Sequence, residues 1–418
     1  MATNKLIIIG GGAAGLMATV AAREFKISAL LLERRHRPGL KLLLCGNNRC
    51  NLSHDASVAK MLQDYGTPVA GFLKTAITTF PPDKLREWFS RQGLPTIVKR
   101  DRIYPKSENS DDVLHCFLDI MREEQLPYVL NCPVKSVAKE NNLFTVTAEN
   151  GLTFQSEKVL IATGGFSYPK TGSVGDGQRI AAELNHSVIA PLPGLAGVDS
   201  EDKLLSFQLE TDIPDVAITV FADGRPVART RGNILCSATT RTSSLPPGTI
   251  LRGSAIFDAT RAIARQKLSQ FTLQLDFCPA LVTPPDNLSR LPLPPALLSR
   301  LAKKPSWVKA YNLQINGIRP LKEAIVSVGG VSLDEINPET MESMILPGLY
   351  FAGEVMDIDG PTGGYNLHAA FATARLAIAS MTRINQAKAM SSRPANKPPR
   401  PPSPRERYGD PRKTSRRW

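Results

Sequence analysis

The first 33 residues predict a strand, a helix and a second strand from their pattern of apolar and small positions. Residues 5–10 form an apolar run that ends at glycines, and residues 13–24 form a small-residue stretch with helical spacing. Residues 28–33 form a second apolar run. Continuous rather than alternating hydrophobicity is typical of parallel strands covered on both faces. We therefore expect a βαβ unit in a buried sheet.

Later apolar segments predict that distant parts of the chain complete this sheet. Residues 144–148 and 152–154 alternate in polarity around Asn150-Gly151, a dipeptide that favours a tight hairpin. Residues 158–161 then form another apolar strand, and residues 349–353 form a last one. Gly-rich loops and an Ala-rich helix at residues 367–381 follow. We expect one α/β domain that draws its strands from both ends of the chain.

The middle of the chain predicts an inserted domain. Residues 216–221 and 225–228 flank Asp223-Gly224 as another hairpin, and residues 284–304 mix prolines with short Leu-rich helical stretches. We interpret residues 191–317 as a mainly β insert with helices. Residues 1–190 and 318–382 are then the two parts of the first domain. A length of 418 residues exceeds what one core usually fills, which agrees with this division.

Residues 383–418 predict a disordered basic tail. After Arg383 the chain has seven prolines and almost no apolar periodicity, so it cannot bury enough surface to offset the entropy of ordering. This segment holds eleven lysines and arginines and two acidic residues, so it carries +9 (11 − 2) of the chain's net charge of +13. Accessible positive charge favours binding to polyanions, which makes nucleic acid a candidate partner of the tail.

Composition narrows the location of the protein. No apolar run is long enough to span a bilayer, and the apolar start at residues 6–9 is shorter than the core of a signal peptide. The six cysteines are scattered through a long chain, unlike the dense framework of a small secreted protein. We therefore expect a cytoplasmic protein with reduced thiols and no membrane partner.

The turn after the first strand predicts a dinucleotide site. Residues 10–15 read Gly-Gly-Gly-Ala-Ala-Gly, which fits G-x-G-x-x-G between a strand and a helix. Gly10 permits the tight turn, Gly12 lets backbone N–H groups approach a pyrophosphate, and Gly15 allows close packing of the helix. Glu33 ends the next strand, where a carboxylate accepts hydrogen bonds from ribose and repels a 2′-phosphate. This favours FAD or NAD over NADP. The alternative is a glycine turn beside an unrelated surface glutamate.

Two further segments separate FAD from NAD and lead to a family. Ala162-Thr163-Gly164-Gly165, and Gly353-Glu354 with Asp357, resemble the second and third cofactor contacts of the glutathione-reductase-type FAD fold, whose sheet is assembled from both termini. The chain resembles bacterial NAD(P)/FAD-dependent oxidoreductases, a family that includes the flavin-dependent ribosomal RNA dihydrouridine synthase and a bile-acid dehydro-reductase. The motifs that carry this resemblance are Gly-Leu-Lys at 39–41, Gly-Asn-Asn-Arg-Cys-Asn-Leu at 46–52, Thr-Gly-Ser at 171–173, Gly-Asp-Gly at 175–177, Thr-Met-Glu-Ser at 340–343, Gly-Leu-Tyr-Phe-Ala-Gly-Glu-Val-Met-Asp-Ile-Asp-Gly at 348–360 and Thr-Gly-Gly-Tyr-Asn-Leu at 362–367.

The resemblance implies bound FAD, with the flavin ring near the Arg-Cys-Asn and Gly-Gly-Tyr-Asn loops. The cofactor contacts that it implies are Gly10, Gly12, Ala14, Gly15, Glu33, Arg34, Lys41, Asn51, Val134, Ala162, Thr163, Gly164, Gly353, Glu354, Asp357, Gly364, Tyr365 and Asn366. No second G-x-G-x-x-G is present, so NAD(P)H is expected to visit the ring transiently, in a ping-pong cycle. Cys45 and His368 stand where the family more often has Ser and Gln, and the family's usual Phe-Thr-His stretch is hard to find in the insert.

Three residues are candidates for catalysis. Cys50 is a thiol that could donate the proton that completes reduction of a C=C bond, and Arg49 could polarise a substrate carbonyl. The alternative for both is that they only shape the flavin loop. His368 is a further candidate proton donor because it follows Asn366 at a helix start.

Cysteine and histidine spacing leaves one alternative open and disfavours metal. Cys45 and Cys50 have C-x4-C spacing, which resembles a redox dithiol that passes electrons to a flavin; otherwise Cys45 is a small buried packing residue. The other histidines, His36, His54, His115 and His186, have no metal-ligand spacing, so surface or packing roles and no metal are expected.

Together these features predict an FAD-dependent oxidoreductase, reduced by NAD(P)H, that transfers hydride to an activated C=C bond. The family suggests a uridine of ribosomal RNA as the substrate. The basic tail fits this in part, because disordered segments rich in Arg and Lys bind RNA backbones; the alternative is that it is only a solvated tail. One rival is a small-molecule reductase or amine oxidase on the same fold. A second rival is a flavin-binding sensor without turnover.

Overall fold

The computed structural model describes residues 4–238 and 248–391. The predicted βαβ unit is confirmed: β1 (Asn4–Ile9) pairs in parallel with β2 (Ala29–Leu32), and α1 (Ala13–Glu24) connects them. Leu6, Ile7 and Ile8 are fully buried, as expected for a strand covered on both faces.

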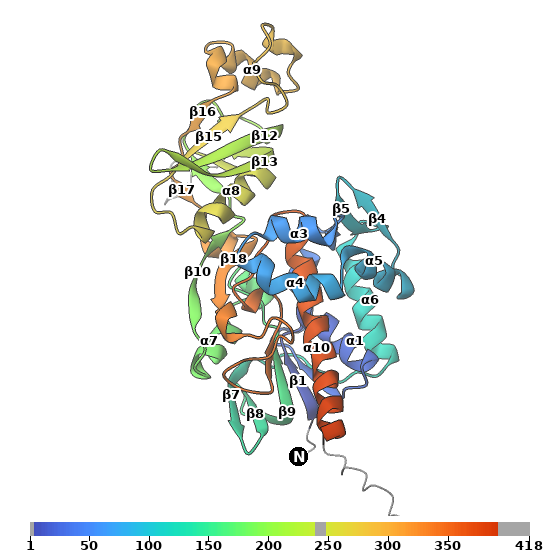
Figure 1. The fold of residues 1–418 in the computed structure, drawn as a ribbon. Helices are drawn as coiled ribbons and strands as arrows, with labels where there is room; N and C mark the ends of the chain where they lie inside the picture. Colours follow the sequence, from blue (N-terminus) through green and yellow to red (C-terminus); the bar gives the residue numbers. More distant parts are fainter. Residues whose placement is uncertain (1–3, 239–247, 392–418) are drawn as a thin grey trace, which may run out of the picture.

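The main sheet has seven strands and is completed from both ends of the chain (Figure 1). Its order is β6-β2-β1-β9-β8-β7, and β19 pairs with β9. The remaining strands are β6 (Tyr128–Val129), β7 (Val134–Glu140), β8 (Leu143–Ala148), β9 (Thr153–Ile161) and β19 (Leu349–Phe351). The hairpin around Asn150-Gly151 is confirmed as β8 and β9.

A single strand, β9, replaces two strands that the sequence pattern predicted. We expected separate strands at 152–154 and 158–161, but β9 runs unbroken through both. The first half of β9 pairs antiparallel with β8, whereas Val159–Ile161 pair in parallel with β1 and β19. Polar residues at 155–158 obscured this continuity, because the pattern of burial changes where β9 passes from one set of partners to the other.

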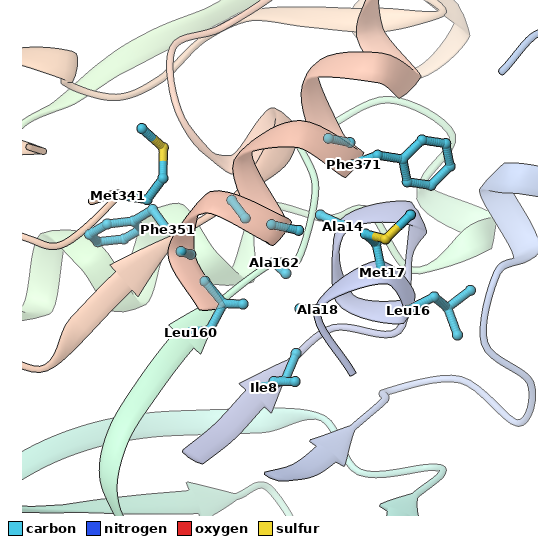
Figure 2. Close-up of a cluster of buried hydrophobic side chains, with 14 of the residues drawn as sticks. Ile8, Ala14, Leu16, Met17, Ala18, Leu160, Ala162, Met341, Phe351 and Phe371 are labelled. Carbon is cyan, nitrogen blue, oxygen red and sulfur yellow. The ribbon is translucent and has the colours of Figure 1, made fainter. Parts of the chain in front are cut away.

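The late helix α10 (Tyr365–Ser391) packs against α1 and so joins the two ends of the chain. Figure 2 shows Phe371 of α10 beside Ala14 and Met17 of α1, with Leu160 of β9 and Phe351 of β19 in the same cluster. The predicted helix at 367–381 is confirmed but is longer at both ends, since it extends into the segment expected to be tail. The rest of the predicted tail, residues 392–418, lies outside the described residues.

A group of helices and a small sheet between β2 and β6 was not predicted. These elements are α2 (Leu40–Leu43), β3 (Ser53–His54), α3 (Val58–Tyr65), α4 (Val69–Thr79), α5 (Pro82–Arg91), β4 (Thr96–Lys99), β5 (Arg102–Pro105) and α6 (Ser110–Glu123). The side chains of Ser57 and Asn109 cap the starts of α3 and α6 by accepting backbone N–H bonds. Trp88, Phe89 and Phe117 pack together and against Phe371 of α10.

The insert forms a separate unit of sheet and helices with its own core, and it lies above the main sheet in Figure 1. Its sheet has the order β16-β15-β12-β13-β14-β11-β17. Its elements are β11 (Val198–Ser200), β12 (Thr211–Ala222), β13 (Arg225–Ala238), β14 (Thr249–Arg252), α8 (Ser254–Arg265), β15 (Thr272–Asp276), α9 (Pro295–Leu301), β16 (Tyr311–Leu313) and β17 (Gly317–Ile318). The hairpin at Asp223-Gly224 is confirmed as β12 and β13, and both residues have positive φ.

Two antiparallel strands connect the insert to the part of the chain that contains the main sheet. They are β10 (Val188–Gly194) and β18 (Val326–Val331). The helix α7 (Asp176–Glu183) precedes β10. The chain therefore leaves the part that contains the main sheet on β10 and returns to it on the neighbouring strand β18. This brings β19 and α10 back to the carboxyl ends of β1 and β9.

Candidate functional site

The glycine turn between β1 and α1 is shaped so that only glycine fits at two of its positions. Gly10 has a φ of +101°, and a Cβ there would lie 2.7 Å from the carbonyl oxygen of Ala162. A Cβ on Gly15 would overlap the carbonyl oxygen of Gly10. Gly12 caps the start of α1, and a Cβ there would have no neighbour within 4 Å. The turn therefore presents the positive end of α1 to open space, where a pyrophosphate can bind.

A cavity lies in front of this turn and holds many of the predicted contacts. Its lining residues are Ile9, Gly10, Gly11, Gly12, Leu32, Glu33, Arg34, Arg37, Gly39, Leu40, Lys41, Cys132, Val134, Thr163, Thr171, Gly172, Ser173 and Asp176. The uncapped start of α1 at Gly12 and the carboxylate residue Glu33 belong to the same wall, so the residues present fit a bound dinucleotide.

Glu33 is held in place at the end of β2. Its two carboxylate oxygens accept hydrogen bonds from the backbone N–H groups of Gly11 at 2.6 Å and Arg35 at 2.7 Å. Burial raises the pKa of Glu33, although both of these hydrogen bonds act to lower it. Glu33 lines the cavity, and each carboxylate oxygen can accept more than one hydrogen bond, which suits the acceptor that ribose hydroxyls need.

The cofactor contacts predicted from the sequence include only some of the residues that line the cavity. Val134 and Arg34 line the cavity as predicted, and Arg34 forms an ion pair with Asp176 at 2.7 Å. Cys132 and Arg37 also line it and were missed, because neither belongs to a recognisable motif. The residues of the Thr171-Gly172-Ser173 motif also line the cavity, whereas the sequence predicted them only as part of the family motif.

A second group of predicted residues joins the cavity to the carboxyl-terminal part of the chain. The ammonium of Lys41 lies 2.7 Å from Glu354 and donates to the hydroxyl of Ser167 at 2.6 Å. Glu354 also accepts from the backbone N–H of Ser327 at 2.9 Å. A Cβ on Gly353 would lie 3.1 Å from Cβ of Ala14. The glycine turn and the late loop therefore face each other at this point, and Ala14 lies between them.

A third group lies where α10 begins. In the orientation that satisfies both ends of its amide, Asn51 donates to the carbonyl of Ser53 and accepts from the N–H of Gly364, each at 3.1 Å. Tyr365 stacks on His54, with ring centroids 4.8 Å apart. Gly363 lies beside the same histidine, whose Nδ1 is 3.3 Å from the Gly363 carbonyl oxygen. The structure therefore brings the two loops expected near the flavin ring into contact.

Two predicted cofactor contacts are engaged elsewhere. Asn366 bridges its own loop by accepting from the N–H of Gly360 at 2.8 Å and donating to its carbonyl at 2.9 Å. Asp357 accepts from Arg265 at 2.8 Å and from the N–H of Gly329 at 2.9 Å. Both side chains hold the loop between β19 and α10, and neither lines the cavity.

The three candidate catalytic residues have different surroundings. Cys50 is fully buried, and burial raises the pKa of its thiol well above the usual value. Arg49 is half exposed, and its guanidinium lies 5.4 Å from the centre of the Tyr104 ring. His368 is fully buried: its Nδ1 pairs with the Ser53 hydroxyl at 2.8 Å and its Nε2 with the Phe80 carbonyl at 2.9 Å. Burial lowers the pKa of His368 to about 4, so the ring is neutral near pH 7.

Two further findings concern the part of the chain that the structure describes. No group of three or more His, Cys, Asp or Glu side chains is placed to hold a metal ion within it. Across residues 4–238 and 248–391, no helix has the length and apolar character needed to cross a membrane.

Comparison with known proteins agrees with this geometry. The sequence profile of one family, described as the HI0933-like protein Rossmann domain, matches residues 4–380. The chain is 29% identical over 414 residues to the 3-dehydro-bile acid delta(4,6)-reductase of Clostridium scindens, with 90% of this chain and 98% of that protein covered. It is 28% identical over 387 residues to the ribosomal RNA dihydrouridine synthase of Escherichia coli, with 88% and 95% covered.

Solved structures share the fold. The 3-ketosteroid-delta4-(5alpha)-dehydrogenase from Rhodococcus jostii RHA1 matches with a TM-score of 0.52 and 14% identity, covering 90% of this chain and 96% of that one. The 3-ketosteroid delta1-dehydrogenase from Sterolibacterium denitrificans matches with a TM-score of 0.51 and 12% identity, covering 92% and 100%. From its profile, its relatives and its cavity, the chain belongs to the HI0933-like Rossmann family and is an FAD-dependent oxidoreductase.

Proposed function

We propose that this protein takes electrons from NAD(P)H and transfers hydride to a C=C bond that is conjugated to a carbonyl group. The observation that carries the proposal is the cavity at the glycine turn, whose wall includes Glu33 and Lys41, together with the ion pair that links Lys41 to Glu354 of the carboxyl-terminal loop. The sequence has no second nucleotide-binding glycine motif, so reductant and substrate are expected to use the same open face of the ring in turn. Both relatives have names that denote reduction of a ring double bond.

The chain's own residues have separate tasks in this proposal. The free N–H groups of Gly12 and the first turn of α1 bind the pyrophosphate, and Glu33, held by the N–H of Gly11, orients the ribose. FAD supplies two-electron redox chemistry when it is bound. The pair formed by Asn51 and Gly364 fixes the two loops between which the ring is expected to lie.

Reduction by a nicotinamide is tested by anaerobic stopped-flow mixing of the flavin-loaded protein with NADH and with NADPH. Rapid loss of the oxidised flavin absorbance with either one is the expected result. Reoxidation by a conjugated enone or by a uridine-containing RNA should then restore the absorbance. A flavin that neither nucleotide bleaches would favour a sensor without turnover and would end the proposal.

Ribosomal RNA is the substrate we propose first, because one relative of nearly full coverage has that named activity. Mass spectrometry of ribosomal RNA from a strain that lacks this protein should show less dihydrouridine, and a plasmid copy should restore it. Unchanged dihydrouridine would favour a small-molecule enone, for which the other relative is the precedent.

The basic carboxyl-terminal segment is proposed to add affinity for RNA. Because α10 is helical to Ser391, deletion of residues 392–418 removes the segment without cutting the described fold. Filter binding to ribosomal RNA fragments should weaken in the deletion variant, and binding by the full chain should fall steeply with salt. Equal binding by the two proteins would remove the segment from the proposal.

A further inference from the structure

Cys45 and Cys50 lie at the two ends of a short loop that folds back on itself. Gly46, Asn47, Asn48 and Cys50 all have positive φ values, between 55° and 62°. This left-handed backbone turns the chain so that the N–H of Cys50 donates to the carbonyl of Cys45 at 2.9 Å. The Cys45 thiol donates to the carbonyl of Asn51 at 3.9 Å, and the Cys50 thiol lies near enough to lower the pKa of Cys45. Both cysteines are free thiols in this structure.

This geometry is compatible with a disulfide. Each Cα lies within about 2.4 Å of its own carbonyl oxygen and about 1.5 Å of its own amide nitrogen. The hydrogen bond of 2.9 Å between the backbone atoms therefore keeps the two Cα atoms within about 7 Å, the upper limit for bridging. Both thiols belong to this one turn, and the Cys50 thiol lowers the pKa of Cys45. Little backbone movement is needed to join them.

The two thiols differ in access. Cys45 is half buried, whereas Cys50 is fully buried. The hydrogen bond from Cys50 lowers the pKa of Cys45, and the positive charge of Lys41 acts in the same direction. Burial raises the pKa of Cys50. A partly exposed thiol with a lowered pKa beside a buried partner is the arrangement of an attacking and a resolving cysteine.

We propose that Cys45 and Cys50 form a reversible disulfide site whose substrate is a low-molecular-weight disulfide. The Cys45 thiolate attacks one sulfur of the external disulfide, which forms a mixed disulfide and releases the first small thiol. Cys50 then attacks the sulfur of Cys45 and gives its proton to the departing thiolate, which leaves as the second small thiol. Two protein thiols are oxidised and one external disulfide is reduced, so electrons and atoms balance.

This inference does not depend on the proposed reductase function. Closing the bond would fix the loop that ends at Asn51, the residue whose amide contacts the N–H of Gly364. The disulfide would then restrict the motion of this loop, next to the segments expected near the flavin, and thiol reductants would release it.

The test uses the full chain as purified, reduced with dithiothreitol, desalted without oxygen and incubated with oxidised glutathione. Intact mass spectrometry should show the loss of two hydrogen atoms relative to the sample without glutathione. Peptide mapping after alkylation should place the link between Cys45 and Cys50. Cys116→Ser is the matched control and should behave as the unsubstituted chain, because the Cys116 thiol contacts the carbonyl of Gln92 and no second cysteine.

Two variants test the assigned order of attack. Cys50→Ser should retain one glutathione on Cys45, since no resolving thiol is left. Cys45→Ser should remain unmodified at Cys50, because that thiol is buried. Cys50→Ala is the substitute if the serine variant does not fold. Glutathione that persists on the unsubstituted chain, or alkylation of both cysteines after exposure to oxidised glutathione, would overturn the inference.

Discussion

At the residue scale, Glu33 sets the polarity of the adenosine end of the cavity. Its carboxylate is 7% exposed and bonded to two backbone N–H groups, so it is fixed before any ligand arrives. Glu33→Gln keeps the shape but replaces one acceptor oxygen by an NH2 group. Loss of a charge-assisted hydrogen bond of about 1.5–3 kcal/mol should weaken FAD binding roughly 10- to 150-fold.

This loss is measured by titrating FAD into the apoprotein and following the quenching of flavin fluorescence. Glu140→Gln, an exposed acid at the end of β7, is the matched control and should bind FAD unchanged. Equal affinity in the Glu33 and Glu140 variants would mean that the carboxylate does not contact the ribose.

His368 is the second residue whose structure gives a quantitative expectation. Burial lowers its pKa from 6.5 to about 4, so the unfolded chain binds a proton at a pH where the folded protein does not. The free energy of unfolding should therefore be at its full value above pH 6.5 and should fall as pH decreases toward 4. A shift of this size corresponds to roughly 3 kcal/mol at the acid end.

Urea unfolding between pH 4 and 7 measures this dependence, with His368→Gln as the variant that cannot titrate. The difference in stability between the two proteins should narrow or reverse below pH 6. His115→Gln, on an exposed position of α6, should follow the unsubstituted chain. Parallel curves for the His368 variant and the unsubstituted chain would contradict a buried neutral ring.

At the element scale, α8 holds the loop between β19 and α10 with three side chains on one face. Asp258 accepts from the N–H of Thr362 at 2.7 Å, and Arg261 pairs with Asp359 at 2.7 Å. Arg265 bonds both Asp357 and Asp359. Burial raises the pKa of Asp258 to about 6, although the hydrogen bonds from Thr362 act to lower it. One helix of the insert therefore fixes the loop that leads to the flavin contacts.

The buried ion pairs of α8 should contribute far more to stability than the exposed ones of the insert. Arg265→Leu leaves Asp359, whose side chain has no exposed surface, without one of its two cations. A loss of about 3–5 kcal/mol in the free energy of unfolding is expected. Arg231→Leu removes an exposed pair with Asp215 and should cost less than about 1 kcal/mol. Denaturant unfolding of both variants distinguishes the two, and equal losses would show that α8 does not hold the loop.

At the scale of the whole molecule, segments from the two ends of the chain pack into one core, and the Lys41–Glu354 ion pair links the cavity wall to the carboxyl-terminal loop. FAD should therefore protect both ends together, while the separate core of the insert should change little. At about 100 times its Kd, FAD should stabilise the protein by about 2.7 kcal/mol. Hydrogen exchange with mass spectrometry, with and without FAD, should show slower exchange in peptides that cover residues 10–15 and 353–366, and unchanged exchange in β12 and β13. Protection confined to the amino-terminal peptides would contradict a site that both ends build.

The sequence by itself determined the local parts whose rules act over a few residues. Continuous apolar runs predicted β1 and β2, the glycines at 10, 12 and 15 predicted the turn that opens α1, and Asn150-Gly151 and Asp223-Gly224 predicted hairpins. The helices α3 to α6 went unpredicted, although the amphipathic pattern of α5 and α6 was available as a signal. The family motifs added the cofactor and the closure of the sheet by β19.

Only the tertiary structure decided which side chains face the cavity and which face inward. Asp357 and Asn366 belong to cofactor motifs in the sequence, yet Arg265 and Gly360 engage them. Cys132 has no motif and lines the cavity. His368 lies beside the flavin motif, and burial against Ser53 and Phe80 makes it a neutral supporting residue. The physical reason is that burial and most of these hydrogen-bond partners are set by packing between separate segments, such as Arg265 for Asp357 and Ser53 and Phe80 for His368, which no local pattern encodes.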